Sequence, residues 1–225
     1  VLPAPTDAIT LPTYAFQRKH FWLRDVIGSD ASVLGLAGAD HPLLGAVVEV
    51  PGSDAVVFTS RLGLNTHPWL AHHTIGDDVL LPGTALVELA VRAGDQVGAP
   101  VLDELVVEAP LVVPAEGAVM VRVVVDPADA SGAHAVRVYA APTDAVSGWR
   151  CHATGALSAH PSTPDADLAV WPPVGAEPAD ISAFYSELAE HGYHYGPAFQ
   201  GLRAVWLRGD EVFAEVALAE EQHAD

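Results

Sequence analysis

The clearest helix signal in the sequence, at residues 84–93, is apolar around nearly its whole circumference. Leu86, Val87, Leu89, Ala90 and Val91 leave it no wide polar face, so other elements have to surround this helix. β-Branched segments precede and follow it, at residues 46–50, 55–60, 101–113 (interrupted by Pro110), 118–125, 134–141 and 149–158. We therefore expect an α+β fold in which an antiparallel sheet curves around one buried helix.

Local signals predict where these elements end. Thr84 suits the N-cap of the helix, and Gly94 suits the left-handed position that follows a helix. Residues 51–54 and 127–132 are rich in turn formers and predict β-hairpins. Residues 161–178 are rich in Pro and Asp and predict a linker. After it we expect a short amphipathic helix at 181–190 and strands at 203–208 and 211–218, which form a smaller second unit.

The charge and the residue counts exclude several classes of function. The chain has 29 acidic and 10 basic residues and a formal net charge of −19, which argues against binding to nucleic acid or to an anionic membrane surface. The one cysteine, Cys151, excludes an internal disulfide and a cysteine-based zinc site. The sequence shows no signal segment and no apolar run long enough to cross a bilayer, so we expect a cytoplasmic protein.

Residues 67–90 bring a base close to unpaired backbone N–H groups. His72 and His73 lie shortly before the helix, and a neutral imidazole can remove a proton next to a thioester carbonyl. The N–H groups of the first helical turn lack intrahelical partners and can stabilise the enolate-like charge that results. Each histidine is equally well explained as a structural residue, so the residue types alone leave the choice open.

A metal site is the other functional interpretation of these histidines. His72, His73 and the His191-x-x-His194 pair are possible ligands. No Asp or Glu completes a known ligand spacing such as H-E-x-x-H, so we expect no metal.

Tyr193 and Tyr195 lie in a Tyr-x-Tyr-Gly-Pro turn. This turn fits aromatic packing alone, and it fits equally well a phenol hydroxyl that orients a substrate hydroxyl. The sequence leaves these two interpretations balanced.

Several segments carry motifs in a fixed order along the chain. These are His41-Pro-Leu-Leu-Gly45, His73-x-x-x-Asp77-x-x-x-x-Pro82-Gly83 and Gly192-Tyr-His-Tyr-Gly-Pro-Ala-Phe-Gln-Gly-Leu202. They resemble the opening segment, the H-x-x-x-G-x-x-x-x-P motif and the G-Y-x-Y-G-P-x-F-Q-G-L motif of dehydratase domains from modular polyketide synthases. Residues 11–23 are similar to the linker that follows the acyltransferase in such synthases. Spacing selects His73 over His72, because the family histidine lies nine residues before the motif proline.

The resemblance implies a double hotdog fold, in which two units each wrap an antiparallel sheet around a helix. It divides the chain into the linker after the acyltransferase (1–38), the first hotdog (39–160), a linker (161–178) and the start of an incomplete second hotdog (179–225). It also implies the loss of water from a β-hydroxyacyl chain to give an α,β-unsaturated thioester. The implied partners are the acyl carrier protein, whose phosphopantetheine holds the substrate, and the other domains of a homodimeric synthase. No further cofactor is implied.

The same resemblance assigns roles to individual residues. His73 is the general base that takes the α-proton, and Tyr195 lies near the leaving hydroxyl. The expected lining of the substrate pocket is Asp77, Leu81, Pro82, Gly83, Tyr193, Gly196, Pro197 and Phe199.

The sequence departs from the family pattern at three points. Asp77 stands where the motif has glycine, with Gly76 one place early, and His72 stands where an acidic residue is usual. The family's second motif, H-P-x-x-L-D, whose aspartate is the general acid, does not occur in these 225 residues. Residues 1–225 alone are therefore expected to have negligible dehydratase activity, since the proton transfer contributes about 10²–10⁴-fold. The alternatives are a non-catalytic scaffold or dimerisation domain, which the Asp77 departure favours, and an isomerase or cyclase on the same fold.

Overall fold

A computed structural model describes residue 31 and residues 35–143, 148–160 and 170–218. Most of the expected linker at 1–38 lies outside these ranges, as do residues 161–169 of the second expected linker. Within the described part, no helix is long and apolar enough to cross a membrane.

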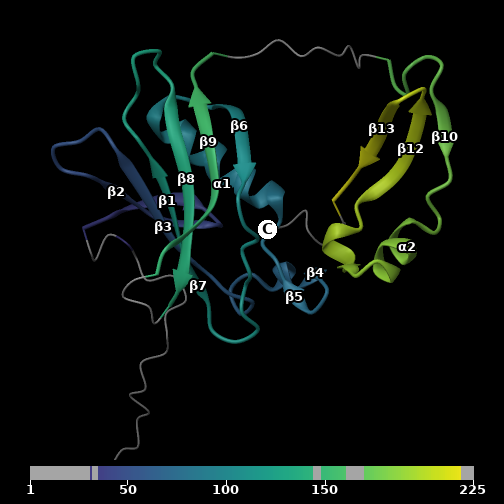
Figure 1. Ribbon diagram of the computed structural model, residues 1–225, viewed down its shortest axis with the longest axis horizontal. Helices are drawn as coiled ribbons and strands as arrows, with labels where there is room; N and C mark the ends of the chain where they lie inside the picture. The colour runs from purple at the N-terminus through teal and green to yellow at the C-terminus, as the bar shows by residue number, and fades with distance from the viewer. Residues whose placement is uncertain (1–30, 32–34, 144–147, 161–169, 219–225) are drawn as a thin grey trace, which may run out of the picture.

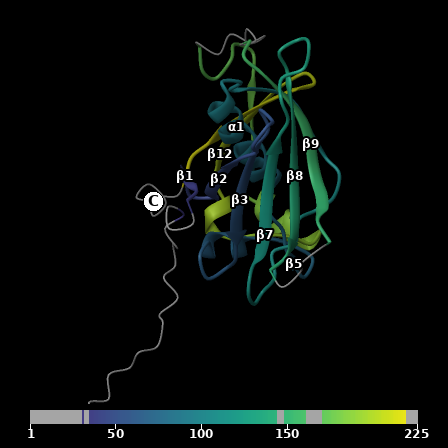
Figure 2. The same ribbon diagram turned by 90° about the vertical axis from the view of Figure 1, so that its left-hand side faces the viewer.

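The first unit is a seven-stranded antiparallel sheet, in the order β1-β2-β3-β7-β8-β9-β6. The strands are β1 (Ala37–His41), β2 (Leu44–Glu49), β3 (Val56–Leu62), β6 (Val101–Val107), β7 (Val119–Val125), β8 (His134–Pro142) and β9 (Arg150–Ser158). The sheet curves around the helix α1 (Gly83–Val97), as Figures 1 and 2 show. The expected α+β fold, with an antiparallel sheet around a buried helix, is confirmed.

Alternation along the strands explains how the sheet covers the helix. In β7, every second residue from Val119 to Val125 is buried, while Arg122 between them is exposed. On α1, Leu89 and Ala90 are fully buried in the same core as Phe58 of β3. Burying one such leucine side chain contributes about 1.5–3 kcal/mol, so this core stabilises the first unit.

Both predicted ends of the helix are wrong. The structure has Pro82 at the N-cap, without a side-chain cap, and the helix continues through Gly94 to Val97. It ends in a Schellman motif, in which the N–H of Gly98 (φ 74°) donates to Asp95 O and the N–H of Ala99 donates to Gly94 O. Gly94 is therefore a buried interior residue of α1.

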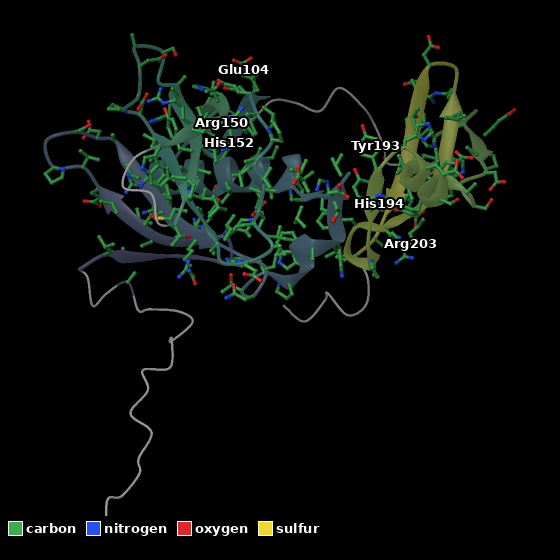
Figure 3. The ribbon with its side chains drawn as sticks, turned by 60° about the horizontal axis from the view of Figure 1, so that its bottom comes forward. Glu104, Arg150, His152, Tyr193, His194 and Arg203 are labelled. Carbon is green, nitrogen blue, oxygen red and sulfur yellow. The ribbon has the colours of Figure 1, made fainter. Side chains whose placement is uncertain are left out.

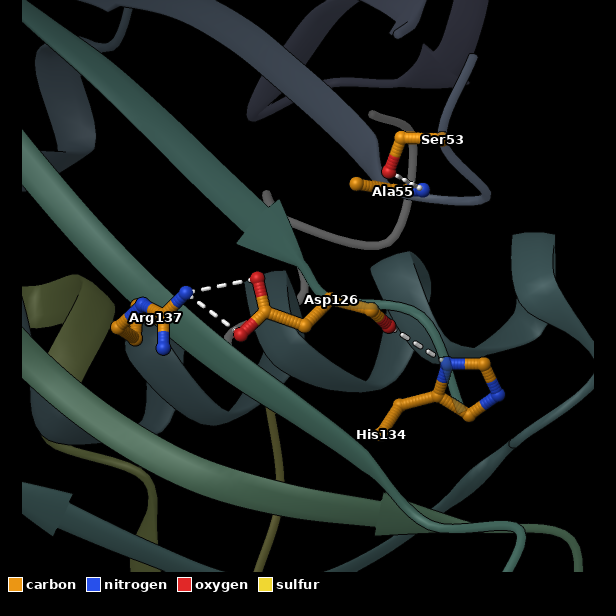
Figure 4. Close-up of polar contacts among 5 residues, drawn as sticks. All are labelled: Ser53, Ala55, Asp126, His134 and Arg137. Carbon is orange, nitrogen blue, oxygen red and sulfur yellow. Dashed lines mark hydrogen bonds and ion pairs between the residues drawn. The ribbon is translucent and has the colours of Figure 1, made fainter. Parts of the chain in front are cut away.

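The two predicted hairpins are confirmed, since β2 pairs with β3 and β7 with β8. Figure 4 shows the polar contacts at their turns. Arg137 Nη2 lies 2.7 and 2.6 Å from the two carboxylate oxygens of Asp126, and His134 Nδ1 donates to the Asp126 carbonyl at 2.8 Å. In the other turn, the N–H of Ala55 donates to Ser53 Oγ at 3.1 Å. These contacts stabilise the ends of the two hairpins.

The second unit follows residue 170 and is smaller. It contains the helix α2 (Phe184–Glu190) and a three-stranded sheet of β10 (Glu177–Ala179), β12 (Leu202–Arg208) and β13 (Glu211–Val216). The strand β10 begins inside the segment that was expected to be a linker. None of the residues of α2 is buried, and Val212 and Val216 of β13 are 67% and 70% exposed. Among the described residues, this unit has no closed core of its own.

A third small sheet joins the two units. It consists of β11 (Tyr193–Tyr195), β4 (His73–Ile75) and β5 (Asp78–Val79) in that order. The neighbouring 3-10 helices η2 (Pro68–His72) and η3 (Pro197–Phe199) pack against each other. Segments about 120 residues apart in the sequence therefore meet at the first motif histidine.

Candidate active site

His73 lies at the start of β4, directly opposite Tyr195 of β11. Residues that face each other in an antiparallel pair point to the same side of the sheet. The imidazole of His73 accordingly stacks on the ring of Tyr195, with ring centroids 5.2 Å apart and an interplanar angle of 20°. The ring of Phe199 closes a second side, with its centroid 5.1 Å from that of His73. The two most specific motifs of the sequence thus meet around one imidazole.

A backbone carbonyl fixes the tautomer of His73. Its Nδ1 lies 3.0 Å from the carbonyl oxygen of Leu80, and a carbonyl can only accept, so the proton is on Nδ1. The hairpin of β4 and β5 positions this carbonyl, because the N–H of Leu80 donates back to the His73 carbonyl at 3.1 Å. In the neutral ring Nε2 is then an acceptor, and no described residue forms a hydrogen bond with it. This is the arrangement that a general base needs.

The start of α1 follows β5 after three residues. The first helical hydrogen bonds are donated by Ala85 and Leu86 to Pro82 O. The N–H groups of Gly83 and Thr84 precede these bonds and lie at the positive end of the helix dipole. The N–H of Leu81 is already paired with Leu111 O at 2.8 Å.

The residues expected to line the pocket differ in their exposure. Leu81 and Pro82 are buried, and Leu81 belongs to the hydrophobic core. Gly83 and Pro197 are exposed, at the first residues of α1 and η3. Tyr193 is 40% exposed and shares a face of β11 with Tyr195.

Gly196 contacts His72, and Phe199 contacts His73. Phe199 also packs on Trp69 of η2, with centroids 6.0 Å apart. Gly196 lies against the ring of His72, where an added Cβ would be 2.8 Å from two ring atoms. Figure 3 labels Tyr193 and His194 on the side of the second unit that faces the first.

Asp77 lies at the tip of the hairpin between β4 and β5. Gly76 and Asp77 form its two-residue turn, and Gly76 is the one with positive φ (61°). A type II′ turn requires a positive φ at the first of its two central residues, which is usually glycine, and not at the second. Gly76 therefore supplies the positive φ that this turn requires, and the Asp77 side chain is exposed.

His72 contacts a different set of partners from His73. Its Nδ1 accepts the N–H of Ala198 at 3.3 Å, and its carbonyl accepts the N–H of Gly196 at 2.8 Å. Sequence reasoning missed these contacts, because nothing in the local sequence links residue 72 to residues 196–198.

The other possible metal ligands do not gather with them. His191 Nδ1 donates to the Glu187 carbonyl within α2, and His194 is exposed on β11. In the part of the chain that the structure describes, no three His, Cys, Asp or Glu side chains are placed to hold a metal ion.

Two family models match the chain. The model described as "Polyketide synthase dehydratase domain" matches residues 41–141, and that described as "Polyketide synthase dehydratase N-terminal domain" matches residues 163–225. Mycoketide-CoA synthase of Mycobacterium tuberculosis is 54% identical over 211 residues, which is 93% of this chain and 5% of that protein. The PikAII component of the pikromycin polyketide synthase of Streptomyces venezuelae is 50% identical over 98% of this chain and 6% of that protein. The chain thus spans only a small part of these relatives.

Solved dehydratase domains have the same fold. The domain from the terminal module of the rifamycin polyketide synthase is 56% identical, with a TM-score of 0.80 over 85% of this chain and 72% of that one. The erythromycin dehydratase is 45% identical, with a TM-score of 0.78 over 84% of this chain and 71% of that one. The expected double hotdog, with the second hotdog incomplete, is therefore confirmed.

Proposed function

Because the chain belongs to the polyketide synthase dehydratase family, we propose that it removes water from a β-hydroxyacyl thioester during polyketide chain elongation. The substrate is carried on the phosphopantetheine of an acyl carrier protein, and the product is an α,β-unsaturated thioester. The observation that carries this proposal is the environment of His73, whose Nδ1 proton is held by Leu80 O while Nε2 is left as an acceptor.

In this proposal, His73 Nε2 takes the proton from the carbon next to the thioester carbonyl. The electron pair of that C–H bond forms the double bond, and the C–O bond to the β-hydroxyl breaks. The leaving oxygen takes a proton from a general acid and departs as water. Family resemblance assigns this acid to the aspartate of H-P-x-x-L-D, a motif that these 225 residues do not contain.

The surroundings of His73 support the other roles in this reaction. Tyr195 stacks on the base and is proposed to orient the β-hydroxyl, and Phe199 and Trp69 are proposed to form an apolar wall that limits the access of water. The N–H groups at the start of α1 are proposed to stabilise negative charge on the thioester oxygen, a contribution that is larger in a dry site. No metal or further cofactor is required. The other domains of the synthase and a second copy of the chain are the proposed structural partners.

The exposed position of Asp77 favours a catalytic domain over a non-catalytic scaffold. The scaffold alternative arose because Asp77 stands at the glycine of the motif. Gly76 already provides the positive φ of the turn, so this departure leaves the hairpin that presents Leu80 O to His73 intact.

The test uses the intact synthase module that carries this chain, loaded with a β-hydroxyacyl carrier protein. We compare the wild type with His73→Ala and, as matched control, His194→Ala, which removes an exposed imidazole from the opposite face of the neighbouring strand. Dehydration is followed by mass spectrometry, and proton removal by exchange of the α-hydrogen in D₂O.

We expect His73→Ala to lower dehydration and α-hydrogen exchange by about 10²–10⁴-fold, the usual contribution of a general base. His194→Ala should remain near the wild-type rate. Full activity of His73→Ala would refute the role of the base. A wild-type module that neither dehydrates its substrate nor exchanges the α-hydrogen would favour the scaffold instead.

A further inference from the structure

His72 joins two segments that are far apart in the sequence. Its carbonyl accepts the N–H of Gly196 at 2.8 Å, and its Nδ1 accepts the N–H of Ala198 at 3.3 Å. Its ring fills the space where Gly196 has no side chain, since an added Cβ there would lie 2.8 Å from Cγ and Cδ2 of His72. Three separate contacts thus hold one short stretch of chain, residues 196–198.

The stretch that His72 holds is flanked by the two aromatic residues that pack on His73. Tyr195 immediately precedes it and Phe199 immediately follows it, with ring centroids 5.2 and 5.1 Å from that of His73. Any movement of residues 196–198 away from η2 therefore moves both rings. The contacts of His72 therefore act on both rings, beside the pairing of β11 with β4 and the packing of Phe199 on Trp69.

The partner of His72 also fixes its protonation state. A backbone N–H can only donate, so the Nδ1 that faces Ala198 has no proton, and the neutral ring carries its proton on Nε2. An imidazolium has N–H groups on both nitrogens and no acceptor. Protonation of His72 would remove this hydrogen bond and place two donors against each other.

We propose that His72 is a positioning residue, whose neutral imidazole docks residues 196–198 onto η2 and so holds Tyr195 and Phe199 against His73. Protonation of His72 removes the contact between Nδ1 and the Ala198 N–H and so weakens this docking. The activity part of this inference rests on the proposed function; the docking itself does not.

Few ionisable groups are carried by the elements that pack against η2. They are His73 on β4 and Asp78 on β5, while η3 has none. The strand β11, which pairs with β4, adds Tyr193, His194 and Tyr195. Because His73 is also an imidazole, the test has to separate the two histidines.

Two variants of His72 separate its protonation from that of His73. In His72→Asn the side-chain carbonyl oxygen can accept the Ala198 N–H but cannot be protonated near neutral pH. In His72→Phe a ring of similar size remains beside Gly196, but the acceptor is lost. His191→Phe is the matched control, since this exposed histidine follows α2 and its Nδ1 donates to the Glu187 carbonyl of that helix.

The first measurement is hydrogen exchange of residues 193–200 between pH 5 and 8, corrected for intrinsic exchange, in the intact module. We expect wild-type protection to fall by about five- to tenfold toward pH 5, because one hydrogen bond is lost. His72→Asn should stay protected at all pH values, His72→Phe should show the lowered protection at every pH, and His191→Phe should match the wild type. Equal protection in wild type and His72→Asn across the range would refute the docking.

The second measurement is the pH dependence of kcat/KM for dehydration. We expect the acid limb of the wild type to involve two protons and that of His72→Asn to involve one. His72→Phe should lose about 10–10²-fold in kcat, since small displacements around a base have effects of this size. Identical pH profiles for wild type and His72→Asn would refute the positioning role.

If His72→Phe does not fold, the comparison of wild type with His72→Asn still tests the proposal. An inactive wild type would refute the proposed function, and the exchange data would then test the docking separately.

Discussion

Replacement of Gly94 by alanine should destabilise the first unit, against the usual effect of this substitution in a helix. In a helix interior, alanine is favoured over glycine by about 1 kcal/mol. The Schellman turn that ends α1 brings the Ala99 carbonyl oxygen back to this point, 2.3 Å from the position that a Cβ at residue 94 would occupy. The Leu157 side chain lies 3.1 Å from the same position.

The structure gives the size of the effect. Ala99 is 2% exposed, and its N–H is held by Gly94 O at 2.9 Å, so its carbonyl can move only if that hydrogen bond, worth about 1 kcal/mol, is lost. Overpacking adds a loss of about 1–3 kcal/mol. After subtraction of the gain in helix propensity, Gly94→Ala should lower the free energy of unfolding by about 1–3 kcal/mol, or Tm by roughly 3–10 °C for a unit of this size.

The assay is thermal and urea unfolding of the dehydratase domain, with Gly83→Ala as matched control. Gly83 is the first residue of the same helix, and nothing lies within 4 Å of a Cβ built there. The control should be unchanged or slightly stabilised, because alanine also restricts the unfolded chain. A Gly94→Ala domain as stable as the control would refute the packing argument.

Three further predictions concern the site and the sheet. Asp77→Gly should change kcat/KM by less than about threefold in steady-state assays, because the side chain is exposed and Gly76 carries the positive φ of the turn. Gly196→Ala should lower kcat by about 10–10²-fold, since its Cβ would displace the His72 ring and with it Tyr195; an unchanged kcat with normal folding would contradict this. Burial, and then the Glu108 carboxylate, raise the pKa of the Cys151 thiol, so a smaller fraction is thiolate at neutral pH, and alkylation by iodoacetamide should be slower than that of glutathione at pH 7.5 and rise with pH.

The sequence predicts the buried helix and most of the strands, because burial leaves a periodic pattern in the residues themselves. The prediction from the sequence is wrong at the ends of the helix. At the C-terminal end, the reason is that Gly94 fits two interpretations. A glycine near the end of an apolar run fits a left-handed cap, and it equally fits a helix interior that another segment approaches closely. The Ala99 carbonyl makes the second explanation correct, and this contact depends on how the chain turns after Gly98.

The candidate site was likewise predicted only in part from the sequence. Motif spacing selects His73, and β4 does pair it with Tyr195. Leu80 stands at an unspecified position of the first motif, yet its carbonyl determines which nitrogen of His73 carries the proton. Backbone partners of this kind leave no trace in residue types, because every residue has a carbonyl and all but proline have an N–H.

The adjacent histidines show why residue type alone could not assign their roles. His73 faces a carbonyl, so its Nδ1 is protonated and its Nε2 can act as a base. His72 faces an N–H, so its Nδ1 is unprotonated and already engaged as an acceptor. Since η2 ends at one histidine and β4 begins at the next, the change of backbone conformation between them directs the two rings to different partners. Two identical side chains thereby acquire opposite tautomers, and only His73 keeps an acceptor nitrogen that no described residue occupies.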